Sequence, residues 1–104
     1  MASPGTYYGL LPASLSFTAA AITDQEIVAA QSGKRISIRN MEFLSDTAVR
    51  LTIKSGSTVI YPITPAIQGL TLDQREVMGL VGENLNFTTS AAATGMVRIE
   101  YWVE

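Results

Sequence analysis

The closing third of the chain carries the strongest structural signal in the sequence. Residues 84–89 and 96–103 both alternate apolar and polar side chains with a period of two. Successive side chains of a β-strand point to opposite faces, so this alternation predicts two half-buried antiparallel strands. Residues 90–95 are small and join them, which predicts one long closing hairpin. The core-facing residues of its second strand are then Val97, Ile99, Tyr101 and Val103, and the outward-facing ones are Met96, Arg98, Glu100 and Trp102.

The same alternation recurs upstream. It predicts strands over residues 14–19, 22–30, 35–44, 49–54, 58–63, 69–72 and 76–80, turns at 31–34, 45–47 and 55–57, and a loop at 64–66. Within 35–44 the alternation slips by one residue at Asn40–Met41, which indicates a β-bulge or a crossover between sheets. Pro62 indicates a sheet edge or a strand end. Eight or nine short strands without a secure helix predict an all-β sandwich or small barrel.

The length and the N-terminal composition define the domain organisation. The 104 residues suffice for one domain. Residues 1–13 combine helix-breaking Pro and Gly with the large side chains of Tyr7, Tyr8, Leu10 and Leu11. We interpret residues 1–13 as an extended arm and residues 14–104 as a β-domain. The apolar side chains indicate that the arm docks, either on a partner or along its own domain.

Residue types that carry catalysis or bind metals are sparse. The chain has no cysteine and no histidine, which removes thiol chemistry, disulfides, and the commonest general base and metal ligand. No glycine-rich phosphate-binding motif is present. The nine carboxylates fall in predicted turns or on polar strand faces, where solvation accounts for them; Asp73 and Glu76 are a faint candidate for calcium. We therefore predict no enzymatic activity, no catalytic residues, no cofactor and no metal site.

Charge and hydropathy exclude two classes of partner. A net charge of −2 and a pI of about 5.0 argue against nucleic acid. No stretch approaches the roughly 18 apolar residues that span a bilayer, and the first residues lack the basic segment of a signal peptide. We expect a protein made in the cytoplasm with no membrane partner. Asn86-Phe87-Thr88 matches a glycosylation sequon, which we interpret as ordinary strand sequence.

Positive charge is concentrated within residues 34–54. This stretch holds five basic residues and two acidic ones, a local charge of +3. If the strands at 35–44 and 49–54 pair, four of the basic side chains share one face: Arg35, Arg39, Arg50 and Lys54. Such a face is either a solvated surface that deters edge aggregation or a contact for an acidic protein. No aromatic residues interleave with these charges, which disfavours nucleic acid.

Trp102 is the only tryptophan, and the alternation places it on the outward face near the C-terminus. Tryptophan is enriched among the residues that anchor protein interfaces. The alternatives are that the N-terminal arm of the same chain covers it or that it stacks on a sugar. Only 15% of the residues are charged, below the usual quarter, which favours a partly covered surface.

The chain ends with a Gly-x-x-Leu segment at Gly82–Leu85, an Ala/Ser-rich turn at residues 90–94 and a Val-x-Ile-x-Tyr strand at Val97–Tyr101. This ending resembles small structural proteins of tailed bacteriophage virions, and the resemblance extends more loosely back to Gly33. It implies a capsid decoration (cement) protein or a related head or tail component. It also implies a jelly-roll-like sandwich, trimer formation, and terminal arms that grip neighbouring subunits.

Together these observations predict a single antiparallel β-sandwich, jelly-roll-like, that serves as a non-enzymatic virion protein. The expected partners are the major capsid protein or other virion proteins and further copies of the chain, with a trimer favoured. The expected contact residues are Tyr7, Tyr8, Leu10, Leu11 and Trp102, with the basic face as a further contact. The alternative is a carbohydrate- or receptor-binding module of a tail or fibre, with Tyr61, Trp102, Asn84 and Asn86 as its sugar-binding set.

Overall fold

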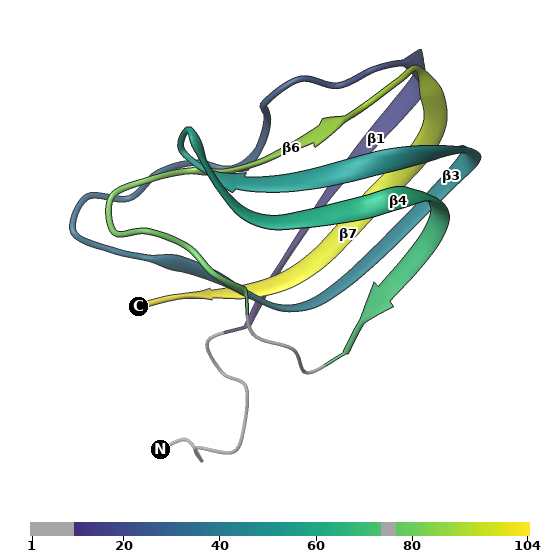
Figure 1. Cartoon of the computed structure of the whole chain (residues 1–104). Coiled ribbons are helices and arrows are strands. Elements are labelled where there is room, and N and C mark those ends of the chain that lie inside the picture. The colour runs from purple at the N-terminus through teal and green to yellow at the C-terminus, as the bar shows by residue number, and fades with distance from the viewer. Residues whose placement is uncertain (1–9, 74–76) are drawn as a thin grey trace.

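A computed structural model describes residues 10–73 and 77–104, without the side chains of Thr64 and Pro65. The described residues form one antiparallel sheet that is nearly closed into a barrel (Figure 1), and they include no helix. The prediction of an all-β fold is confirmed. The strands are β1 (Leu11–Ala20), β2 (Gln25–Val28), β3 (Ile36–Ser55), β4 (Thr58–Leu72), β5 (Val77–Met78), β6 (Leu85–Thr89) and β7 (Ala93–Val103).

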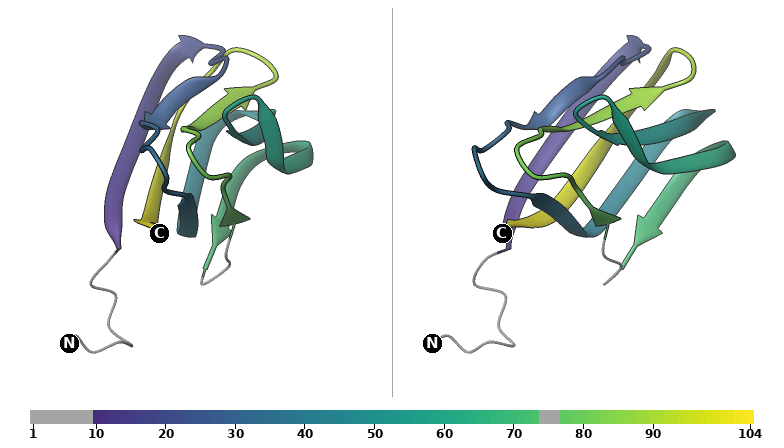
Figure 2. Two further views of the ribbon diagram at one scale, coloured as in Figure 1. Left: turned by 90° about the vertical axis from the view of Figure 1, so that its left-hand side faces the viewer. Right: turned by 60° about the vertical axis from the view of Figure 1, so that its left-hand side comes forward.

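The sheet is built from four long stretches of chain: β1 with β2, β3, β4, and β6 with β7. β6 and β7 follow one another along one side of β3, and β4 runs along its other side. β2 and β1 in turn pair with β6 and β7. We call β1, β7, β5 and residues 36–45 of β3, with residues 69–72 of β4, the first half-sheet. The second half-sheet contains β2, β6, residues 49–55 of β3 and residues 58–63 of β4. Figure 2 shows from two other sides how the sheet curls.

The predicted closing hairpin has the right strands but the wrong pairing. β6 and β7 do not pair with each other; β6 lies between β2 and β3, and β7 lies between β1 and β3. Alternation determines the face that a side chain takes, but it leaves the partner strand open. Residues 90–92 form a corner between the half-sheets. Ser90 and Arg50 hold this corner, because each backbone N–H donates to the other residue, at 3.0 and 2.9 Å.

β3 is continuous where the sequence predicts two strands and a turn at residues 45–47. Asp46 in this stretch accepts two hydrogen bonds. Its carboxylate accepts one from the backbone N–H of Thr94 at 2.9 Å, and its backbone carbonyl accepts one from the side-chain amide of Gln68 at 3.1 Å. These hydrogen bonds support a bend in β3 that leads from the first half-sheet to the second. The loop predicted at 64–66 is likewise part of β4.

Other local predictions are confirmed. The register of β3 against β7 shifts between Ile38 and Asn40, which is the bulge that the slipped alternation indicates. The turn between β3 and β4 is made by Gly56 and Ser57, and Gly56 has a φ of 60°, which favours glycine. β4 pairs with β3 but with no other long strand of the described chain, so Pro62 lies on an edge.

One apolar core draws on both half-sheets. Val97 and Ile99 of β7 are fully buried, as predicted, and Arg98 and Glu100, which alternate with them, are exposed. From the second half-sheet, Phe87 of β6 is fully buried in the same core. Because alternate residues of every central strand enter this core, the outward-facing residues are left to interact with other molecules.

The boundary between arm and sheet differs from the prediction. β1 begins at Leu11, and residues 11–13 pair with residues 99–101 of β7. These three residues, assigned to the arm from sequence, belong to the sheet, and Leu10 beside them is half-buried. Tyr7 and Tyr8 lie outside the described residues, as does Glu76.

Candidate functional site

One end of the first half-sheet presents apolar side chains at the surface. There Trp102 of β7 and Met78 of β5 are the register partners of Ser37 on either side of it. Ser37 shares their outward face, yet its exposed fraction is 0%. A small side chain on an outward face is buried only if its larger neighbours close over it. Glu104 contributes as well, because its carboxylate accepts a hydrogen bond from the Ser37 hydroxyl at 3.0 Å.

The apolar surface continues into the segment that follows β5. The backbone N–H groups of Gly79 and Gly82 donate to the carbonyls of Ile36 and Lys34, at 3.0 and 2.7 Å, which holds residues 79–82 alongside the start of β3. A Cβ on Gly79 would collide with the Ile36 carbonyl, so this close approach requires glycine. Leu80 and Val81 are thereby fixed at the same end, and they are exposed.

Three of the six exposed large apolar side chains of the described residues belong to β5 and the segment after it: Met78, Leu80 and Val81. Leu11, a fourth, is the register partner of Tyr101 and therefore lies on the inward face, opposite to Trp102. Large apolar side chains that gather at one place mark interaction sites, whereas single ones are ordinary. The remaining two, Leu44 and Val59, belong to opposite half-sheets. We call the following residues the end patch: Met78, Leu80, Val81 and Trp102.

Trp102 is half-buried and faces outward, as the alternation predicts. The guanidinium carbon of Arg39 lies 5.7 Å from the centre of its ring, a cation–π contact within the chain. This contact fixes the orientation of the indole at the border of the end patch. The sequence did not predict Met78, Leu80 and Val81 as site residues, because only the pairing of β5 with β3 brings them to Trp102 and no local pattern indicates that pairing.

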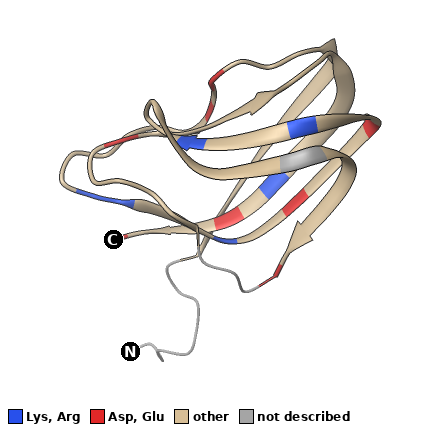
Figure 3. Ribbon diagram, in the orientation of Figure 1, with Lys and Arg blue, Asp and Glu red and all other residues tan. Residues whose placement is uncertain are grey.

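The predicted basic face does not form. Arg35 directly precedes β3 and Arg39 lies in its first part, whereas Arg50 and Lys54 lie in its second part. The two parts of β3 do not pair with each other. The hairpin turn falls after Ser55, so β3 pairs with β4 instead of folding back on itself. Figure 3 shows the basic residues spread over separate parts of the sheet.

Lys54 is engaged in an ion pair. Its ammonium lies 2.8 Å from the Asp24 carboxylate, which also accepts a hydrogen bond from the Thr88 hydroxyl at 3.1 Å. The bond from Lys54 and then that from Thr88 lower the pKa of Asp24 below its ordinary value of 3.8. The contacts of Asp24 with Lys54 and Thr88 join the residue before β2 to β3 and β6. They indicate a structural role for Lys54.

Asp24→Asn is expected to lower stability at neutral pH and to lose this effect in acid. Because the folded pKa of Asp24 is depressed, its charged form stabilises the fold above the unfolded pKa, and this contribution disappears as the pH falls below 3.8 through the folded pKa. Asn tolerates the φ of 48° at this position. Urea midpoints of both proteins, measured from neutral pH into acid, should converge; a constant gap would contradict the assignment.

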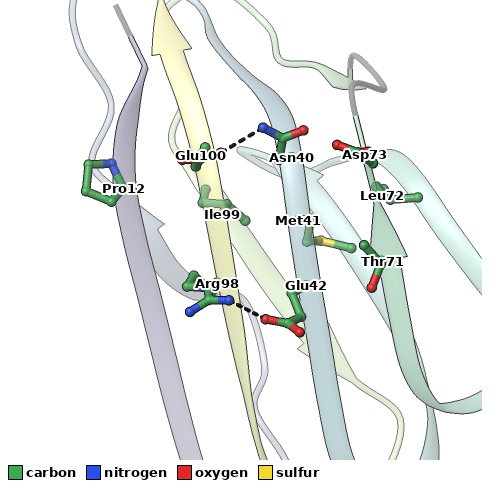
Figure 4. Close-up of a pocket in the computed structure, with 10 residues that line it drawn as sticks. All are labelled: Pro12, Asn40, Met41, Glu42, Thr71, Leu72, Asp73, Arg98, Ile99 and Glu100. Atoms are coloured by element: carbon green, nitrogen blue, oxygen red, sulfur yellow. Dashed lines mark hydrogen bonds and ion pairs between the residues drawn. The ribbon is translucent and has the colours of Figure 1, made fainter. Parts of the chain in front are cut away.

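The outer face of the first half-sheet contains a hollow of about 510 Å³ (Figure 4). Two polar pairs cross it from β7 to β3: Arg98 contacts Glu42 at 2.5 Å, and Asn40 donates to Glu100 at 2.7 Å. The full lining is Pro12, Asn40, Met41, Glu42, Thr71, Leu72, Asp73, Arg98, Ile99 and Glu100. Within the described part of the chain, no three residues of the metal-binding types gather into a possible metal site.

The sugar-binding set expected from sequence is not brought together. Tyr61 packs against the core, and Asn86 is 2% exposed. The Asn86 amide donates to the Gly56 carbonyl at 2.9 Å and to Asn84 at 3.0 Å, which leaves it inaccessible to a sugar. Asn86 belongs to the second half-sheet and Asn84 directly precedes it, whereas Trp102 belongs to the first half-sheet. The burial of Asn86 also agrees with the interpretation of the sequon as strand sequence.

Comparison with known proteins adds no relative. The described residues include no helix that could span a membrane. No protein-family model, curated protein or solved structure matches this chain.

Proposed function

We propose that this protein is a non-enzymatic structural component of a tailed-bacteriophage virion, a capsid decoration protein that binds across capsid subunits and stabilises the shell. The end patch is the observation that carries the binding function. The virion assignment rests on the resemblance of residues 82–103 to small phage structural proteins. The partners in this proposal are the major capsid protein and further copies of the chain, with a trimer favoured.

The proposal includes a jelly-roll-like sandwich as the form of the sheet. Its support is the bend shared by all four long stretches, together with a core drawn from both half-sheets. Such a scaffold keeps its outer surfaces rigid, so that little conformational entropy is lost when the end patch meets a partner.

The binding energy expected from the end patch suits a decoration protein. Burial of apolar surface contributes about 25 cal/mol per Å², and a central tryptophan commonly contributes more than its neighbours. Each copy of the chain then binds with modest affinity through its end patch. Oligomerisation places several patches against one shell and multiplies the affinity through effective concentration.

Trp102→Ala combined with Met78→Ser is expected to weaken binding to expanded capsid shells by at least about 30-fold, the loss typical of an interface anchor of 2 kcal/mol. Purified expanded capsid shells of tailed bacteriophages would be sedimented with increasing protein, and the bound copies counted. The matched control is Leu44→Ser with Val59→Ser, which changes two exposed apolar residues outside the patch. Equal binding by both variants, or no binding by the wild type, contradicts the proposal.

A glycan-binding module is the second candidate, and the hollow in the first half-sheet favours it. Arg98, Glu42 and Glu100 offer polar groups there, and Trp102 is the next outward-facing residue of β7 after Glu100. A glycan array decides between the two: binding that Arg98→Ala abolishes supports the module, and silence on the array together with shell binding supports decoration.

A further inference from the structure

β1 lies at the edge of the first half-sheet and has one open side. It pairs with β7, and no other described segment of the chain hydrogen-bonds to its backbone. Figure 2 shows β1 as the outermost strand of this half-sheet. The unpaired N–H and C=O groups of an edge strand can pair with a strand of another chain, so proteins usually protect them with charges, prolines, bulges or short strands.

β1 has little of this protection. None of its ten residues is charged, and its register against β7 is regular from Leu11 to Phe17. The other edge strands are short or interrupted. β2 has four residues, one of them Glu26, and β5 has two. β4 contains Pro62 and pairs with β3 through three register shifts. The long regular edge of the described chain is therefore that of β1.

The hydrogen bonds of β7 determine which groups of β1 are open. Glu104, directly after β7, exchanges both backbone hydrogen bonds with Arg35, at 2.8 and 2.9 Å. Because the bonding direction alternates along a strand, the even-numbered residues of β7 bond to β3 and the odd-numbered ones to β1. The even-numbered residues of β1 are register partners of even-numbered residues of β7. They therefore direct their backbone groups to the open side: Pro12, Ser14 and Ser16. Proline has no N–H, which suits Pro12 to this position.

We infer that two copies of this chain pair along β1, antiparallel, about a two-fold axis at Leu15. In this register Ser14 of each copy lies opposite Ser16 of the other, so each of these N–H groups meets a carbonyl. An axis at Ser14 would place Ser16 opposite Pro12, whose nitrogen cannot donate. An axis at Ser16 would use Thr18, where the register of β1 has begun to shift. The contact is isologous, and the first half-sheet continues from one copy into the other.

The side chains suit the same register. Leu15, which is half-buried in the single chain, meets its own copy across the axis on the inward face. Ala13 lies opposite Phe17 on that face, so apolar side chains meet apolar ones. On the outward face the nearest charges lie one strand in from the edge, on β7. Arg98 is the register partner of Ser14, and it lies level with Met96 of the other copy, the register partner of Ser16. Like charges therefore do not face each other, which favours a second copy as the partner.

The contact is small and leaves the end patch exposed. Edges of this length bury less than the roughly 1,200 Å² of a standard interface, so we expect a reversible dimer that forms as the concentration rises. β1 contributes no residue to the end patch, and the dimer presents two patches. The contact has two-fold symmetry and is distinct from that of the proposed trimer. It does not rest on the proposed function.

Sedimentation equilibrium of the full chain tests the pairing. The wild type is expected to change from a monomer of 11.2 kDa to a dimer as its concentration rises. Ser14→Pro removes an open N–H from each copy and is expected to weaken the dimer by at least about tenfold, while the bonds between β1 and β7 remain, as they do at Pro12. The matched control Ser14→Ala keeps the N–H and should associate as wild type. Circular dichroism and urea midpoints verify that each variant folds.

A cysteine at the axis tests the register, because the chain has none of its own. Leu15 and its copy form a pair without mutual backbone hydrogen bonds, in which the Cα atoms lie about 4.5 Å apart, a separation that a disulfide can bridge. Leu15→Cys is expected to give a disulfide-linked dimer on mild oxidation. Ala13→Cys is the matched control: Ala13 lies opposite Phe17, so the two introduced cysteines are too far apart to be bridged.

Three results would overturn the inference. The first is a wild type that stays monomeric at every concentration or forms only trimers. The second is self-association that Ser14→Pro leaves unchanged, which would assign it to another surface such as the end patch. The third is cross-linking of Ala13→Cys as fast as that of Leu15→Cys, which would exclude an axis at Leu15.

Discussion

Replacing Phe43 with Ala is expected to lower the free energy of unfolding by about 3–5 kcal/mol. Phe43 is fully buried, and its ring stacks on Phe17 with 6.4 Å between the ring centres. Its register partners are Val97 on β7 and Leu70 on β4. Because both neighbouring strands are held by the ladder, they cannot close the space that the ring leaves. The loss is a large part of the roughly 5–15 kcal/mol that stabilises an ordinary domain.

Leu44→Ala is the matched control for this prediction. Leu44 follows Phe43 on β3 and points to the opposite face, where it is 49% exposed. Its replacement is expected to change stability by no more than about 0.5 kcal/mol. Urea unfolding followed by circular dichroism measures both variants, and similar losses from the two would show that the faces of β3 are assigned wrongly.

Gly95→Ala is expected to destabilise the protein by about 1–3 kcal/mol, through overpacking against backbone. Gly95 lies in β7 beside the corner of β3. A Cβ at this position would collide with the carbonyl oxygen of Leu44 and lie 2.9 Å from the Cα of Ser45. Both of these atoms belong to the backbone of β3, so the strands themselves must move apart to admit the Cβ. Thermal or urea unfolding measures the loss.

Gly69→Ala separates this steric effect from the general effect of replacing a glycine in a strand. Gly69 is the register partner of Leu44 on the other side of β3, and a Cβ there would lie 3.6 Å from the nearest atom, the carbonyl oxygen of Phe43. Alanine fits, and by restricting the unfolded chain it is expected to leave stability unchanged or raise it by up to about 1 kcal/mol. A Gly95 variant as stable as the Gly69 variant would contradict the close approach of β7 to the corner.

The sequence predicted only part of the candidate site. The outward orientation of Trp102 follows from alternation within β7, which is a local property. The other half of the patch depends on the pairing of Met78 with Ser37 on the opposite side of β3 from Trp102, and these two residues are 41 positions apart in the chain. The prediction of a basic face was wrong for the same reason, because it required the two parts of β3 to pair with each other, and β3 pairs with β4 instead.

The alternation of apolar and polar residues was enough to predict an all-β fold and the face of most side chains. Local sequence also predicted the bulge near Asn40, the turn at Gly56 and the burial of Val97 and Ile99. These are properties of a few consecutive residues, whose backbone geometry fixes where the side chains point. The strand pairing of the fold was needed to show that β6 and β7 align end to end along β3, and that residues from β5, β7 and the segment after β5 gather into the end patch. Strand pairing is a competition among distant segments with similar alternation, and the packing of the whole core selects the outcome.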